Sequence, residues 1–225
     1  MPLQNASIKV TAFIIGGFDT TKRPMVVGGA MLIAYVLAIF ANIVNILFII
    51  YDKRLHKPMY ILICNLALVD ILYTSSASPT MIGVLLAGVK TVSYVPCIIQ
   101  MFAFHLGGVM EMFALVVMAF DRLVAISYPF QYHSYLTNVR TLGLTCVLWI
   151  AACCFVSVMP ATVLPLPHCH TTLKLGVALT TEERHGLMIG AVLGPPLVNP
   201  FVYCLRTKEI KYKIFSRFKR VGAFQ

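Results

Sequence analysis

Charge is what this sequence has least of. Only 12% of its 225 residues are charged, whereas 59% are hydrophobic, and 8 acidic residues stand against 18 basic ones. Globular chains are about a quarter charged and roughly half apolar, so this chain has too few charges to cover a surface that faces water. A bilayer is the solvent that fits this composition.

Soluble modules and catalytic motifs are also missing. No linker, low-complexity tract or separate basic domain occurs, so a nucleic-acid partner is not expected. No nucleophile–base set, metal cluster or phosphate-binding loop argues for an enzyme. His168 and His170 flank Cys169, but two imidazoles are too few ligands for a closed zinc site. We therefore expect one membrane domain that is not an enzyme, with no metal and no cofactor.

Long apolar stretches are what the sequence does have. A membrane-spanning helix needs about 20 consecutive apolar residues, and five stretches are long enough. They are Val26–Ile50, Met59–Val89, Thr91–Phe120 (its helix continuing to residue 127), Thr141–Pro167 and Gly186–Leu205. This pattern predicts an all-α, polytopic transmembrane helical bundle over residues 26–205. Residues 1–25 precede the bundle, and residues 206–225 form a basic tail.

The basic residues indicate the orientation. If the N-terminus lies outside the cell, 12 of the 18 basic residues fall in inner segments, close to the ends of spans. Asn5 begins an Asn-Ala-Ser sequon, which is glycosylated only on the outer side. We expect a multi-pass protein with an outer N-terminus and a cytoplasmic tail. Its net charge of +10 then favours contact with anionic inner-leaflet lipid.

Asp121 and Arg122 stand side by side at the inner end of the third stretch. At that depth a charge reaches headgroups or water, so its cost is moderate. One interpretation is an anchor at the membrane interface. The other is a switch that faces a cytoplasmic partner.

The surrounding residues favour the switch. MAFDRLVAISYPFQY resembles the M-A-Y-D-R-Y-V-A-I-C-x-P-L-x-Y stretch of odorant receptors, a branch of the rhodopsin-like G-protein-coupled receptors. KPMYILICNLALVD and PPLVNPFVYCLRTKEIK are similar to that family's second span and to its last span with the tail. The likeness covers residues 20–170 as the first four spans and 186–215 as the last. It implies that the family's fifth and sixth spans are missing here.

The resemblance implies a receptor in the plasma membrane. A small odorant binds within the helix bundle, and a heterotrimeric G protein binds at the inner face, where Asp121 and Arg122 form the switch. A receptor dimer is also implied as a possible state. One alternative is a truncated, non-signalling remnant or partner of full-length receptors. A small transporter or channel is a weaker alternative, since it calls for inverted repeats or pore-lining charges that the sequence does not show.

Polar residues of the spans carry over from the family one by one. Asn42, Asp70 and Asn199 match an internal polar cluster, which either binds sodium or ties the helices through a neutral, packed acid. Asn199 also begins the motif of the last span, with Pro200 and Tyr203.

The outer side carries the remaining candidates. The resemblance places a disulfide at Cys97, for which Cys169 is the outer partner in this sequence. In the third span, four residues spaced i, i+3, i+4 and i+7 share one helix face. These residues are His105, Gly108, Val109 and Met112. They either line the odorant pocket or pack in an ordinary helix–helix contact.

Overall fold

The computed structural model describes residues 12–14, 23–128, 130–163 and 189–200. Four long helices dominate this part of the chain: α1 (Pro24–Tyr51), α2 (Pro58–Ala87), α3 (Tyr94–Ser127) and α5 (Asn138–Val163). Short elements connect them, namely the 3-10 turn η2 (Lys53–Leu55) and α4 (Tyr132–Tyr135). Residues 189–200 are also helical, and strands β1 (Ala12–Ile14) and β2 (Thr91–Ser93) form one small antiparallel pair.

Local signals in the sequence explain where the helices begin and end. Pro24 and Pro58 occupy the first turn of α1 and α2, where the missing N–H of proline costs nothing. Gly88 ends α2 in the left-handed conformation at φ +66°, and its N–H bonds to the carbonyl of Gly83. At the start of α5, the Thr137 hydroxyl accepts a hydrogen bond from the backbone N–H of Arg140.

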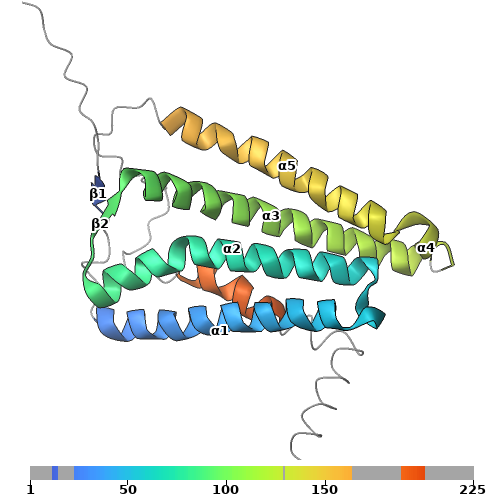
Figure 1. The fold of residues 1–225 in the computed structure, drawn as a ribbon, viewed down its shortest axis with the longest axis horizontal. Helices are drawn as coiled ribbons and strands as arrows, with labels where there is room; N and C mark the ends of the chain where they lie inside the picture. Colours follow the sequence, from blue (N-terminus) through green and yellow to red (C-terminus); the bar gives the residue numbers. More distant parts are fainter. Residues whose placement is uncertain (1–11, 15–22, 129, 164–188, 201–225) are drawn as a thin grey trace, which may run out of the picture.

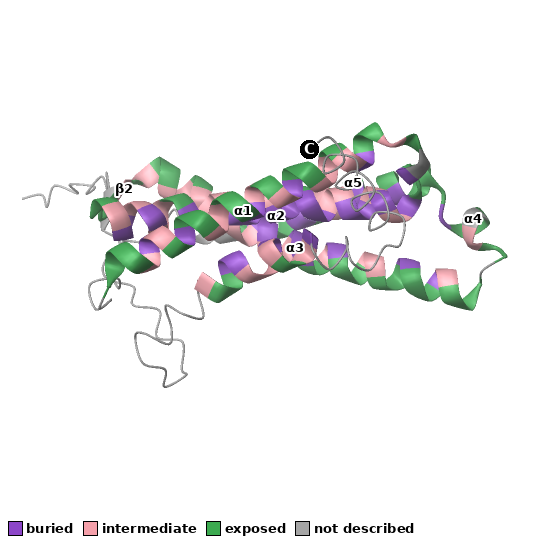
Figure 2. Ribbon diagram, turned by 90° about the horizontal axis from the view of Figure 1, so that it is seen from below, coloured by how far each residue is buried: buried purple, intermediate pink, exposed green. Residues whose placement is uncertain are grey.

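The helices form one bundle in which α2 is central (Figure 1). α2 packs against α1 on one side and α3 on the other, and α3 also packs against α5. Residues 189–200 lie beside α1 and α2, with Leu193 buried against Met31 and Leu85. Figure 2 shows that buried residues gather along α2 and on the faces that meet it.

The outward faces of the bundle are apolar. Phe40 of α1, Val116 of α3 and Phe155 of α5 are each more than half exposed. By length and composition, α1, α2 and the Asn138–Val158 part of α5 can cross a membrane. α3 has 34 residues and is about 51 Å long at 1.5 Å per residue, more than a bilayer core requires. Lipid chains are the solvent that suits these faces.

The predicted all-α helical bundle is confirmed, with one addition. The third predicted stretch started at Thr91, but α3 starts at Tyr94. Residues Thr91–Ser93 are extended and pair with Ala12–Ile14, so that Ala12 lies opposite Ser93. This pairing could not be predicted from local patterns, because the two strands lie far apart along the chain and have three residues each.

Candidate functional site

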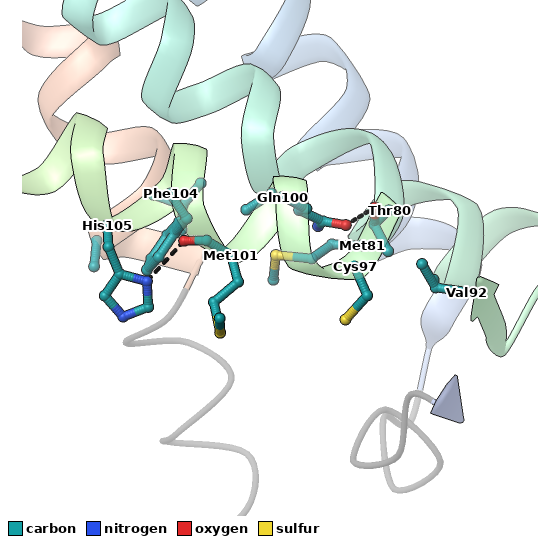
Figure 3. A pocket seen from close by; sticks show the side chains of 11 residues that line it. Thr80, Met81, Val92, Cys97, Gln100, Met101, Phe104 and His105 are labelled. Carbon is teal, nitrogen blue, oxygen red and sulfur yellow. Dashed lines mark hydrogen bonds between the residues drawn. The ribbon is translucent and has the colours of Figure 1, made fainter. Parts of the chain in front are cut away.

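An open cavity of about 370 Å³ lies between α2, α3, β2 and the helix of residues 189–200 (Figure 3). Its lining is mostly carbon and sulfur, with few polar groups. The lining residues are Ala77, Thr80, Met81, Val92, Cys97, Gln100, Met101, Phe104, His105, Ala191 and Val192. An apolar hollow with a few placed polar groups is the usual form of a small-molecule site.

The polar groups of this cavity are held in place by their neighbours. The hydroxyl of Thr80 donates a hydrogen bond to Oε1 of Gln100 at 3.0 Å. The Nδ1 atom of His105 lies 2.8 Å from the backbone oxygen of Met101. The ring of Phe104 meets the His105 ring edge-on, with 5.6 Å between centroids. These side chains therefore present defined orientations to the cavity.

Among the four third-span residues proposed for the pocket, the structure places His105 at the cavity and the others elsewhere. Gly108 faces Tyr73, and Val109 packs on the core cluster shared by α2, α3 and α5. Met112 is 65% exposed on the outside of the bundle. The cavity takes its α3 residues from Cys97 to His105 instead.

Below the cavity, the polar residues of three helices come together. Asp70 of α2 is 1% exposed. The amide nitrogen of Asn199 donates to both of its carboxylate oxygens, at 3.2 and 3.1 Å. A buried acid in a membrane protein requires such partners.

Asn42 of α1 also contacts the helix of residues 189–200. Its amide nitrogen donates to the backbone oxygens of Ala38 and Pro196, both at 3.0 Å. Pro200 lies four residues after Pro196 and has no N–H, so it cannot make the helical hydrogen bond to the Pro196 oxygen. The side chain of Asn42 supplies the missing donor. It thereby ties α1 to the point where the last helix lacks its own bond.

Glu111 belongs to this cluster, although we did not include it from the sequence. It is 7% exposed on α3 and lies close enough to the side chain of Asn199 to interact with it electrostatically. Its position as the one acid within an apolar stretch was the available signal, since a buried acid needs a partner. Asn199 thus hydrogen-bonds to the acid of α2 and lies beside the acid of α3.

At the inner end, Asp121 and Arg122 face different neighbours. Asp121 is 2% exposed and accepts a hydrogen bond of 2.7 Å from the hydroxyl of Tyr132 in α4. Arg122 is exposed, and its guanidinium contacts the sulfur of Met59 at the start of α2. Burial, followed by the hydrogen bond to Asp121, raises the pKa of Tyr132.

The inner loops are tied to one another by two further residues. The guanidinium of Arg140 donates to the backbone oxygens of Ser134 and Tyr135, at 2.7 and 3.3 Å. The amide of Asn138 donates to the backbone oxygen of His56 at 2.9 Å. The turn after α1, the segment after α3 and the start of α5 therefore form one connected inner surface.

Three of the residues singled out from the sequence lie outside the described residues: Asn5, Cys169 and Tyr203. Cys97 is half-buried and lines the cavity. The glycosylation at Asn5, the Cys97–Cys169 disulfide and a role for Tyr203 remain predictions.

Comparison with known proteins agrees with this architecture. Residues 41–211 match the family described as the 7 transmembrane receptor (rhodopsin family). The chain therefore belongs to the rhodopsin family of seven-transmembrane receptors, and it is not an enzyme.

Its relatives place the chain more narrowly. It is 38% identical over 170 residues to Olfactory receptor 4D1 of Homo sapiens. These residues make up 75% of this chain and 54% of that protein. It is 30% identical over 217 residues to Olfactory receptor 1M1 of Mus musculus, covering 91% and 69%. Within the rhodopsin family the chain is therefore odorant-receptor-like. It spans about half the length of the first curated relatives it matches.

Proposed function

We propose that the chain binds a small, mostly apolar odorant in the cavity between α2, α3 and residues 189–200. The observation that carries this proposal is the cavity itself, an apolar hollow of about 370 Å³ at the end of the bundle away from Asp121. Its few polar groups come from Thr80, Gln100 and His105, a composition that suits a small molecule with one polar group.

The contacts below the cavity suggest how binding is transmitted. Ala191 and Val192 line the cavity, and Asn199 on the same helix hydrogen-bonds to Asp70 and lies beside Glu111. A ligand that moves this helix also strains the hydrogen bonds of Asn199. The Asn42 contact to Pro196 sits at the weakened turn, where the helix bends most easily.

The inner end is the proposed site of a heterotrimeric G protein. Asp121 is held by Tyr132, while Arg122 is exposed and therefore available to a partner. α3 runs from the cavity through Glu111 to these two residues. The protein then acts in the plasma membrane with its N-terminus outside and this surface in the cytoplasm.

A second candidate is a non-signalling partner of full-length receptors. The observation that favours it is the outer face of α3, where Met112, Val116 and Phe120 are more than half exposed. An apolar face of this kind packs equally well against lipid or against a helix of another receptor. The two candidates differ in whether ligand binding produces a G-protein response once the two missing spans are restored.

The test compares this chain with a chimera that carries two further spans from a related receptor after α5. Both are expressed in cells, and the cyclic-AMP response to an odorant panel is measured. We expect a response from the chimera and none from the chain alone. Coupling between the ligand site and the G-protein site requires a structural element with two states. In the resembled family two helices oppose Arg122, and these are the spans that we expect to be missing here. A ligand-dependent response from the chain alone contradicts this expectation.

Ligand binding by purified chain is measured in parallel. Binding by the chain without a response from the chimera supports the non-signalling partner. Absence of binding in both the chain and the chimera contradicts the proposed ligand site.

A further inference from the structure

The tautomer of His105 determines what the cavity can recognise. Its Nδ1 atom lies 2.8 Å from the backbone oxygen of Met101, and a carbonyl oxygen can only accept. Nδ1 therefore carries the proton. In a neutral imidazole the other nitrogen, Nε2, then has a lone pair and no hydrogen.

The position of Nε2 leaves this lone pair available. Figure 3 shows Nδ1 turned back toward the Met101 oxygen, while the other ring nitrogen points away from α3. Nε2 makes no hydrogen bond with any residue that the structure describes, and His105 lines the cavity. The cavity wall thus offers one hydrogen-bond acceptor on an otherwise apolar side.

A second polar point comes from the pair formed by Thr80 and Gln100. The Thr80 hydroxyl donates to Oε1 of Gln100, and the amide hydrogens of Gln100 are the donors that this pair leaves over. The cavity therefore presents an acceptor at His105 and a donor at Gln100.

We infer that this cavity selects small alcohols over the carbonyl compounds of the same carbon skeleton. The inference rests on the proposed function and names the ligand class of that same site. A hydroxyl group can donate to Nε2 of His105 and accept from Gln100. A ketone can only accept, so it leaves Nε2 without a partner once the ligand has displaced water. An unpaired polar group in a binding site is the strongest basis for rejecting a near-identical ligand.

The remaining walls determine the rest of the ligand. Met81, Val92, Ala191 and Val192 surround the cavity with carbon and sulfur and carry no charge. A flexible alkyl chain makes dispersion contacts with such walls, whereas a second polar group finds no partner there. The ligand is therefore a monohydric alcohol with an apolar skeleton.

The test uses octan-2-ol and octan-2-one, which differ only in the oxidation of one carbon. Binding of each labelled compound to the full chain in nanodiscs is measured, and uptake by empty nanodiscs is subtracted. We expect the alcohol to bind about tenfold more tightly, the effect of roughly one unmet hydrogen bond. His105→Phe removes the acceptor, so the preference falls to near one, mainly through weaker binding of the alcohol.

Met101→Leu is the matched control variant. Met101 also lines the cavity, but its contact with His105 uses the backbone oxygen, which leucine retains. The preference for the alcohol should survive in this variant. If Met101→Leu loses the preference for the alcohol as fully as His105→Phe does, the inference is overturned, because the preference then does not depend on the imidazole.

Two results separate this inference from the proposed function. Equal binding of both compounds by the native chain overturns the alcohol preference and leaves the ligand site standing. Binding of neither compound by well-folded chain contradicts both. If His105→Phe does not fold, nitrogen NMR of the native chain with labelled histidine decides the point. A proton on Nδ1 of His105 supports the inference, and a proton on Nε2 overturns it.

Discussion

Asn199 is central to the polar cluster, because its side chain hydrogen-bonds to Asp70 of α2 and lies close to Glu111 of α3. We predict that Asn199→Leu destabilises the protein by roughly 1 kcal/mol, since the buried carboxylate of Asp70 loses its donor. Thermal unfolding in detergent measures this change. The fluorescence of Trp149 is a suitable signal, because its ring nitrogen bonds to Asn65 across the α2–α5 interface.

The control for this prediction is Val198→Ala, at a position that is 55% exposed on the same helix. Equal unfolding temperatures of Asn199→Leu and this control contradict the prediction. Adding Asp70→Asn to Asn199→Leu should restore part of the loss, because an amide never carries a charge and so depends less on the lost donor.

Tyr132 gives a second prediction, which concerns pH. The pKa of Tyr132 is raised in the folded chain, whereas it is about 10 in the unfolded chain. Above about pH 10 the folded state therefore keeps a phenol proton that the unfolded state has lost. The stabilising effect of Tyr132 is therefore fully present below about pH 10 and is lost as the pH rises further. Tyr132→Phe should be less stable than the native chain at pH 8, and the difference should narrow at pH 11.

The measurement is denaturant unfolding of both chains at the two pH values. Tyr135→Phe is the matched control, since Tyr135 lies in the same short helix. Its ring packs on the ring of Tyr128, with 6.1 Å between the centroids. A difference between Tyr132→Phe and native chain that stays constant from pH 8 to 11 contradicts the assignment.

At the scale of the secondary-structure elements, α2 and α3 approach each other closely at Gly107. A Cβ atom added there would lie 2.8 Å from Cβ and 2.9 Å from Cα of Tyr73, too close for ordinary contact. We predict that Gly107→Ala destabilises the chain by about 1–3 kcal/mol, because the two helices must move apart. The same thermal unfolding experiment measures the loss.

Gly108→Ala serves as the control on the next residue. Its added Cβ would lie 3.7 Å from the Tyr73 ring, an ordinary contact, and alanine favours a helix more than glycine does. We expect this variant to be at least as stable as the native chain. A loss in Gly108→Ala equal to that of Gly107→Ala would show that helix spacing is not the cause.

For the whole molecule, the prediction concerns orientation in the membrane. The distribution of the basic residues along the sequence predicts that the N-terminus lies outside the cell. Glycosidase treatment of protein made in animal cells should increase its electrophoretic mobility, and Asn5→Gln should abolish that shift. An antibody that reaches a C-terminal epitope on unpermeabilised cells contradicts this orientation.

The length and spacing of apolar runs were enough to predict a helical membrane protein and the order of its helices. These features depend only on local composition, because each helix satisfies its own backbone hydrogen bonds within the bilayer. Asn42, Asp70 and Asn199 were also predicted to form one polar cluster, through the resemblance of their surroundings to known receptors, and the structure joins Asp70 to Asn199.

Only the tertiary structure decided which faces of the helices meet. It brought Glu111 to Asn199 and turned Met112 outward, although both lie on α3. It placed the cavity along Cys97 to His105, nearer the start of α3 than we expected. In a chain whose helices are apolar on every side, periodicity does not mark an inner face. The rotation of each helix is determined instead by close contacts such as Gly107 with Tyr73 and by buried polar bonds to distant residues.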